Sequence, residues 1–583
     1  MRHSVLSARR LVRTTSLSAG IILLAACGDS QPGAEAPSPA DLVLRGGVVA
    51  TVDADNTMAE ALAITGGWIV AVGSNDEVDA YIGDETEVIE LNGRFAAPGF
   101  IEGHGHYMSL GNSKTILDLN GAANWDAIVE MVAEAVATAE PGQWIRGRGW
   151  HQEKWDRPPD PAIEGNPTHA SLSAVSPDNS VLLGHASGHA AFANAAALAA
   201  GGYDDDSEPP PGGELVRDEH GKLTGLLRET AQRPVSAAFS RSQSGRTAEE
   251  IDAQFRREVQ LAAEEALSKG VTSFQDAGAS FSTIDRLKQL EDEGALAVRL
   301  YVMVRGQSNE QMDARLADYY MPSDGDDYLT VRSIKRQIDG ALGSHGAWLL
   351  EPYEDMPSSV GLVLETVEDI TGTAHVAIKH GYQVNTHAIG DRANREVLDI
   401  YQAVFDSAGG ADDLRWRIEH AQHVHPDDIP RFAELGILAS MQGVHATSDA
   451  PWIPLRLGDD RAEKRTYVWR AFMDAGVPIN NGTDVPVEDI SPLAGFRSSV
   501  TRLTADGSIF YPEQNMTRTE ALRSYTINNA FAAFEEAYKG SLEVGKLGDV
   551  VVIDRDILTV PDAELADARV EVTIVGGEVR YAR

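Results

Sequence analysis

Between about residues 95 and 540, short apolar runs alternate with longer stretches in which apolar residues recur at helical spacing. This alternation is typical of βα units repeated around a parallel sheet. The helical stretches include 246–269, 391–405 and 517–534. Eight runs are candidate strands, the number that closes a (β/α)8 TIM barrel: 95–101, 271–275, 297–304, 331–338, 382–387, 416–420, 437–441 and 477–480.

Both ends of the chain show a different pattern, with short β-like runs joined by Gly-Gly turns. The runs are 42–52 and 61–72 near the start, and 549–553 and 570–581 near the end. We expect residues 42–94 and 541–583 to form one small composite β-sandwich domain, into which the barrel domain of residues 95–540 is inserted. Residues 124–240 are Pro-rich in part and carry further β-like pieces, so we expect an insertion over the barrel mouth.

The first residues resemble an export signal. Four arginines and no acid precede an apolar run at 16–26, which is about half the ~20 residues that a membrane-spanning helix needs. The run ends in Leu24-Ala25-Ala26-Cys27-Gly28, which resembles the lipobox of bacterial lipoproteins. We therefore expect a lipoprotein-type signal peptide at 1–26, lipidation of Cys27 and a flexible tether at 27–41. The protein would then be exported and anchored by its lipid to the bacterial cell envelope, with its body in the periplasm or outside.

The strongly negative net charge of the chain excludes one class of binding partner. The chain has 49 Lys and Arg against 88 Asp and Glu, a net charge of -39, which argues against binding to nucleic acid. Cys27 is the only cysteine, so a disulfide within the chain and a cysteine-based zinc site are both excluded. A metal ion would have to use His, carboxylate or modified Lys ligands.

Histidines and one aspartate stand where the predicted strands end. His104 and His106 are two residues apart on the first strand, so their side chains point the same way and can bind one ion together. His387 and His420 each follow an apolar run and precede a helical stretch, where barrel enzymes place catalytic groups. Asp484 follows the last strand and can bind a metal ion or accept a proton from water. Taken singly, each could instead have an ordinary structural role.

Several motifs in the same order resemble the amidohydrolase superfamily, and within it the family 3 branch that contains N-substituted formamide deformylase-like proteins. The resemblance runs from about residue 42 to the end of the chain. The motifs are PGFIEGHGH (98–106), GRGW (147–150), GHASGHAAFAN (184–194), DGALGS (339–344), NTHAIGDRAN (385–394), IEHAQ (418–422), GTD (482–484) and GSLEVGKLGDVVVID (540–554).

The resemblance implies a centre of one or two divalent ions at the barrel mouth. His104 and His106 would bind one ion, His387 and His420 the other, and a carboxylated Lys335 would bridge them. Asp484 would be both a ligand and the catalytic proton acceptor. Such a ligand set suits Zn²⁺ first, with iron or manganese as alternatives. Lys335 could instead be a surface cation, because arginines at 332 and 336 flank it.

Further residues are candidates for substrate contact, although a purely structural role is an alternative for each: Trp150, His185, His189 and His345. Two positions depart from the family pattern. Glu102 replaces the usual Asp of Asp-x-His-x-His, and His345 stands where Arg is frequent.

We expect a metal-dependent hydrolase that cleaves a non-peptide C–N bond, of the amide or N-formyl type, by metal-activated water. Its partner would be a small amide-type molecule, and homo-oligomers are compatible with the sequence. A deaminase or cyclic-amide hydrolase on the same scaffold is the alternative within enzymes. A catalytically inactive, surface-anchored binding lipoprotein is the alternative from another class.

Overall fold

The computed structural model describes residues 37–583 except 324, 326 and 411. The expected signal peptide, Cys27 and most of the expected tether lie outside the described residues. Within the described part, no helix has the length and apolar character that crossing a membrane would require.

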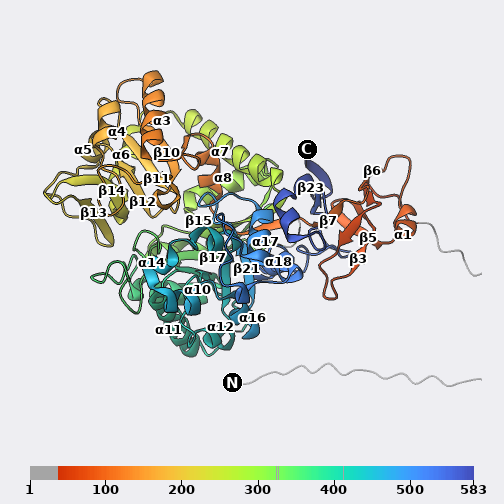
Figure 1. The fold of residues 1–583 in the computed structure, drawn as a ribbon. Helices are drawn as coiled ribbons and strands as arrows, with labels where there is room; N and C mark the ends of the chain where they lie inside the picture. Colours follow the sequence, from red (N-terminus) through yellow and green to blue (C-terminus); the bar gives the residue numbers. More distant parts are fainter. Residues whose placement is uncertain (1–36, 324, 326, 411) are drawn as a thin grey trace, which may run out of the picture. The chain divides into compact units, whose positions relative to one another are not determined.

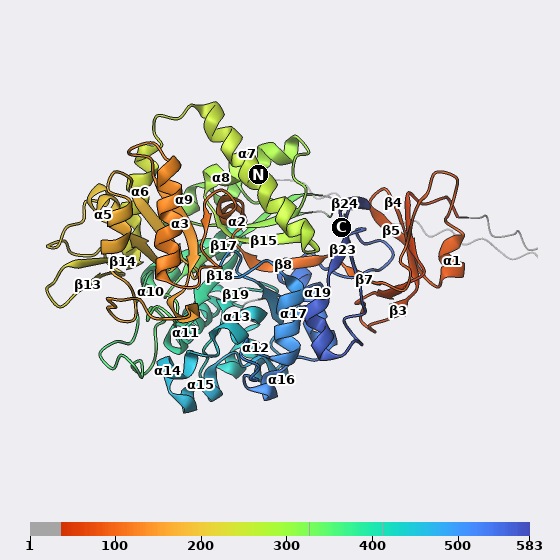
Figure 2. The same cartoon turned by 45° about the horizontal axis from the view of Figure 1, so that its top comes forward.

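Eight parallel strands form the central sheet, in the order β21-β20-β19-β18-β17-β16-β15-β8. Asp484 N–H, just after β21, donates to His104 O on β8 at 2.7 Å, so the last strand adjoins the first. The expected TIM-barrel class is confirmed (Figures 1 and 2). The strands are β8 (Phe100–Gly105), β15 (Val271–Ala279), β16 (Arg299–Val304), β17 (Leu329–Gln337), β18 (Gln383–Ala388), β19 (Arg417–His420), β20 (Leu438–Gln442) and β21 (Ile479–Gly482).

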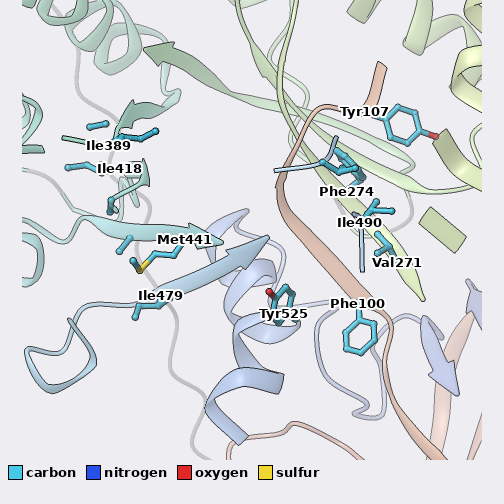
Figure 3. Packing of buried hydrophobic residues seen from close by; sticks show 14 of the residues in the cluster. Phe100, Tyr107, Val271, Phe274, Ile389, Ile418, Met441, Ile479, Ile490 and Tyr525 are labelled. Atoms are coloured by element: carbon cyan, nitrogen blue, oxygen red, sulfur yellow. The ribbon is translucent and has the colours of Figure 1, made fainter. Parts of the chain in front are cut away.

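Helices follow the strands and bury their apolar sides against the sheet. α7 (Ala248–Ser268) begins at a capping box in which the Thr247 and Glu250 side chains each accept from the other's backbone N–H. α10 (Val367–His380) and α11 (Asp391–Ala408) each end at a glycine with left-handed φ. Figure 3 shows Phe100 of β8 with Val271 and Phe274 of β15 in the core between strands and helices.

Two sheets built from the two chain ends pack face to face. One contains only early strands, β5 (Trp68–Gly73), β4 (Ala61–Thr65), β1 (Leu42–Arg45) and β6 (Glu87–Glu90). The other joins early and late strands, in the order β24-β23-β22-β7-β2-β3 (Figure 1, red and dark blue). Its members are β24 (Glu578–Ala582), β23 (Val570–Val575), β22 (Val550–Ile553), β7 (Phe95–Pro98), β2 (Val48–Ala50) and β3 (Met58–Ala59). Leu44, Leu62, Val550 and Ile574 share the core between the sheets.

The first predicted strand, 95–101, is wrong as a single strand. The structure divides it at Gly99, so that β7 pairs with β22 in the sandwich while β8 enters the barrel. A Cβ on Gly99 would lie 2.3 Å from the Thr272 side chain. The chain changes sheets at a position where only glycine fits, and one continuous apolar run does not reveal this.

The predicted helix at 517–534 is two helices, α18 (Arg518–Ser524) and α19 (Ile527–Ala532). Between them the Tyr525 carbonyl accepts a hydrogen bond from Ile101 N–H on β8 at 2.8 Å. In a continuous helix this carbonyl would instead accept a backbone hydrogen bond from the next turn.

A six-stranded sheet forms the inserted segment, in the order β13-β14-β12-β11-β10-β9. β9 (Leu117–Asp118) already pairs with β10 (Ile145–Trp150), so this sheet starts before residue 124. The other strands are β11 (Val181–His185), β12 (Ala190–Ala193), β13 (Gly213–Arg217) and β14 (Leu223–Glu229), and α6 (Arg233–Ser242) leads back towards the barrel.

Candidate metal centre

The carboxyl ends of four barrel strands bring a cluster of histidines and one aspartate together. Among the described residues, one ligand atom each of His104, His420 and Asp484 lies within 4.8 Å of the others, and all three residues are buried. His387 adjoins this cluster, with its ring centroid 4.4 Å from that of His420. His106 Nε2 lies 3.2 Å from Asp484 Oδ1. The cluster mixes the two histidine pairs that the sequence suggested.

His104 is fixed by a carboxylate on a neighbouring strand. Its Nδ1 lies 2.5 Å from Glu419 Oε2, and both side chains are fully buried. His104 Nε2 therefore faces the cluster, at 3.6 Å from Asp484 Oδ1. A histidine that donates one ring N–H to a carboxylate and presents the other nitrogen is the arrangement that metal-binding histidines adopt.

His420 is held in a similar way. Its Nδ1 lies 2.9 Å from Gln442 Oε1 on β20, which leaves Nε2 for the cluster. The backbone of His420 is left-handed, with a φ of 77°, and Ala421 follows at 43°. Regular strand residues alternate between faces. The left-handed turn lets the adjacent residues Glu419 and His420 both reach the site, at a cost of about 1–3 kcal/mol.

Asp484 is placed by an equally unusual backbone, with a φ of 57°. Its Oδ1 is buried and makes no hydrogen bond of good geometry within the described residues, although His106 Nε2 lies 3.2 Å away. Burial alone would raise the pKa of Asp484, but contact with His106 and the neighbouring imidazoles of His420 and His104 hold it well below the usual value. The side chain is therefore an ionised carboxylate with an unsatisfied oxygen.

His387 Nε2 is another buried atom without a hydrogen-bond partner in the described part of the chain. It lies 3.6 Å from Asp339 Oδ1. Asp339 accepts hydrogen bonds from the backbone N–H groups of Ile389 and Gly390, at 3.0 and 2.8 Å, and so orders the turn that follows β18. Buried polar atoms are almost always satisfied. Two orphaned ligand atoms on the wall of one cavity, His387 Nε2 and Asp484 Oδ1, therefore indicate a missing partner.

Lys335 lies inside the barrel rather than on its surface. The residue is 3% exposed, and its Nζ is 3.2 Å from His104 Nε2. Burial lowers the pKa of Lys335 to about 8. The alternative of a surface cation is therefore wrong; the flanking Arg332 stacks on Phe534 and Arg336 pairs with Glu365.

The donors fit a divalent cation. Burial lowers the pKa of His104 to about 4 and takes the pKa values of His387 and His420 well below their ordinary range. These imidazoles are neutral at neutral pH, which is the form that binds a metal ion. Together with the Asp484 carboxylate and its orphaned oxygen, the arrangement fits a metal site built from nitrogen and oxygen ligands.

The inserted sheet places two of its histidines beside this cluster. His189 Nδ1–H donates to the Glu229 carboxylate, whose two oxygens lie 2.9 and 3.0 Å away, and the His189 ring centroid is 5.4 Å from that of His387. His185 lines the same cavity as His420 and Asp484, but Ser187 and Gln152 occupy its two ring nitrogens.

The structure does not bring Trp150 or His345 to the cluster. Trp150 is 1% exposed in the core of the inserted sheet, and its indole N–H donates to Leu183 O at 2.8 Å. His345 pairs with Asp355 at 3.2 Å and lines a separate small cavity.

Glu102, the departure from the usual motif, turns away from the cluster to bind the backbone. It accepts from Thr483 N–H at 2.7 Å, from the Thr483 hydroxyl at 2.8 Å and from His104 N–H at 3.1 Å. Glu102 thereby ties β8 to the end of β21, which positions both His104 and Asp484.

Sequence reasoning missed Glu419, Gln442 and Glu229. Glu419 stands inside the IEHAQ motif, directly before His420, and an alternating strand would have turned it away from its neighbour. Gln442 and Glu229 have no local signal, because only the fold brings them to the histidines that they orient.

Comparisons with known proteins agree with this geometry. A family model described as "Amidohydrolase family" matches residues 87–581. Protein LONG AFTER FAR-RED 3 of Arabidopsis thaliana is 34% identical, covering 93% of this chain and 92% of its own. N-substituted formamide deformylase of Arthrobacter pascens is 29% identical, covering 93% and 98%. A solved structure of an uncharacterized metal-dependent hydrolase from Pyrococcus horikoshii has a TM-score of 0.70 at 26% identity, covering 90% of this chain and 99% of that one.

Proposed function

The chain belongs to the amidohydrolase family, and from that premise we propose that it hydrolyses a non-peptide C–N bond of the N-formyl or N-acyl amide type. The observation that carries the proposal is Asp484, an ionised carboxylate with an orphaned Oδ1 in a cluster of neutral imidazoles. Similarity to a formamide deformylase over nearly the whole chain supports the substrate class.

His104, His387, His420 and Asp484 would hold the metal, with His106 beside them and Zn²⁺ as the ion that this ligand set suits first. A divalent ion in such a site supplies Lewis acidity, which polarises a carbonyl and lowers the pKa of water. Asp484 would accept a proton at Oδ1 from the attacking water and return it to the departing amine nitrogen.

Other residues of the chain would position these groups. Glu419 and Gln442 fix the ring nitrogens that His104 and His420 present. His189 faces the cavity beside His387 with its Nδ1–H held by Glu229. Burial alone would lower the pKa of His189, but Glu229 outweighs this effect and raises it, and the resulting imidazolium would donate from Nε2–H to the substrate carbonyl oxygen. The inserted sheet covers this side of the site and limits the access of bulk water.

Lys335 would be carboxylated and bridge two ions. Its neutral amine would add to CO₂ and release one proton to solvent, giving a carbamate whose single negative charge is shared by two oxygens. Complete burial beside His104 and a pKa of about 8 favour the neutral amine that this step needs. Without the modification, a cationic ammonium would occupy a place 3.2 Å from a ligand atom.

Metal analysis of a form that begins at residue 28 tests this proposal, beside the double variant His104→Ala/His106→Ala. We expect about two ions per chain in the parent and a clear loss in the variant, with release of free amine and carboxylate from formamide substrates. One ion per chain would contradict the bridging role of Lys335. A metal-loaded protein that instead releases ammonia would contradict the amide hydrolase in favour of a deaminase.

We also propose that the chain is exported and anchored by lipid on Cys27, on the strength of the lipobox-like sequence alone. Growth of the producing bacterium with labelled fatty acid should label the protein, and Cys27→Ser should abolish the label. An unlabelled protein that stays in the cytoplasm would refute the anchor without affecting the proposed chemistry.

A further inference from the structure

A cavity of about 300 Å³ opens beside the metal cluster, between the barrel mouth and the inserted sheet. His387, His420 and Asp484 form part of its wall. Three arginines from separate elements form another part: Arg148 of β10, Arg233 of α6 and Arg305, which follows β16. The net charge of the chain is -39, so a cavity wall with three positively charged guanidinium groups differs in sign from the molecule as a whole.

None of these three arginines forms an ion pair with a carboxylate of the described residues. One terminal nitrogen of Arg148 donates a hydrogen bond to Ala186 O at 2.7 Å. The buried Nε of Arg148 has no hydrogen-bond partner within the described part of the chain. Among the residues that the structure describes, the Arg305 side chain donates only to the neutral Gln337 side chain, at 2.6 Å. By contrast, Arg228 in the same inserted sheet binds two glutamates at 2.8 Å each.

The nearby acids are already engaged. Glu365, whose charge reaches Arg305, pairs with Arg336 at 2.8 Å. Glu229 pairs with His189, and Asp276 accepts the backbone N–H of Tyr107. The charge of Asp484 also reaches Arg148 and Arg305, but a metal ion bound in the cluster would take up that charge. With the metal in place, the positive charge of the arginines is left to the cavity.

Keeping these charges apart from counterions is costly. Burial lowers the pKa of Arg148 to about 10 and also lowers that of Arg305, and Arg233 lies near enough to lower the latter further. An anion in the cavity would relieve both the desolvation and the mutual repulsion. The planar fork of a guanidinium group matches the two oxygens of a carboxylate.

A second cavity that also borders His420 and Asp484 has a different lining. It includes Leu342, Ile389 and Trp452 beside His420 and Asp484, and its exposed lining is more apolar than polar. A substrate spanning the cluster would meet cationic groups at one end and apolar groups at the other.

We propose that the arginine-lined cavity binds a carboxylate of the substrate, so that the enzyme acts on N-formyl or short N-acyl derivatives of amino acids with an apolar side chain. This deepens the proposed function and rests on it. Arg148 and Arg305 would be specificity-determining residues. Arg233, which also lines the cavity, would add to its positive electrostatic potential.

A matched substrate pair tests the proposal: N-formylphenylalanine and N-formyl-2-phenylethylamine, which differ only in the carboxylate. We expect the metal-loaded protein to have a kcat/KM at least tenfold higher for the acid. Arg305→Gln and Arg148→Gln should each lower that value about tenfold or more, since a desolvated charge partner is lost, and leave the value for the uncharged amide unchanged. Arg241→Gln, on α6 but outside the cavity lining, is the control.

The outcomes separate this proposal from the one on which it rests. If wild type and Arg305→Gln hydrolyse both compounds equally well, the carboxylate site is wrong and the amide hydrolase stands. If neither compound is hydrolysed, calorimetric titration of the same protein decides. Binding of the acid alone, lost in Arg305→Gln, supports the site, whereas no binding overturns it. Should Arg148→Gln fail to fold, the Arg305 variant carries the test.

Discussion

Glu419 acts on the metal cluster indirectly, through the His104 ring nitrogen that faces away from the cluster. By accepting from His104 Nδ1 at 2.5 Å it fixes both the tautomer and the ring orientation. Such partners tune the affinity of a metal site, although no metal-ligand spacing marks them in the sequence.

Glu419→Gln should therefore weaken metal binding by about 10–100-fold, since an amide can offer its NH₂ to His104 and release the ring. Competition with a chelator of known affinity measures the change. Glu535→Gln is the matched control, because Glu535 is also buried but pairs with Lys539 and contacts none of the cluster. Equal affinity in Glu419→Gln and wild type would show that His104 needs no such partner.

Asp484→Asn should lower kcat by about 10²–10⁴-fold, because an amide cannot take the proton from water. The comparison must be made at equal metal content, measured on the same samples. Asp489→Asn, five residues on and paired with Lys269 at the surface, should leave kcat unaltered. If Asp484→Asn lowers kcat only slightly, a residue other than Asp484 must accept the proton.

At the scale of elements, the strands of the barrel could be predicted because each is a short apolar run before a helix. The candidate ligands followed from their positions at the strand ends. The change of sheet at Gly99 could not be predicted, since it depends on the side chain of Thr272, far away in sequence. Glu419 and the arginines of the cavity could not be predicted for the same reason. Their roles depend on residues of other elements that only the fold brings close to them.

Gly99→Ala tests that change of sheet. The added methyl group would meet Thr272 on β15, so we expect a destabilisation of about 1–3 kcal/mol. Urea unfolding followed by tryptophan fluorescence measures it. Gly121→Ala is the control, since a Cβ there has open space and the backbone φ is not left-handed. Equal stability of the two variants would mean that β7 and β8 can shift apart without cost.

At the scale of the whole molecule, the metal cluster ties β8, β18, β19 and the end of β21 together. An ion that binds only the folded chain stabilises it by about 4 kcal/mol at a free concentration 1,000 times its dissociation constant. Removal of metal by a chelator should lower the thermal midpoint, and Zn²⁺ should restore it. His104→Ala/His106→Ala should melt at the same temperature with and without chelator. An unchanged midpoint in the wild type would argue against a tightly bound ion.

The sheet that joins the two chain ends also sets the order in which this protein can be completed. Val550 pairs with Pro98, so β7 waits for a neighbour made about 450 residues later. At the usual ribosomal speed of about 5–20 residues per second, that delay is roughly 20–90 s. During this time β7 keeps an open apolar edge, and a ribosome that stalls before β22 leaves a nascent chain whose earliest strands cannot be buried. We therefore expect chaperones to shield the first strands of this enzyme until its last ones emerge.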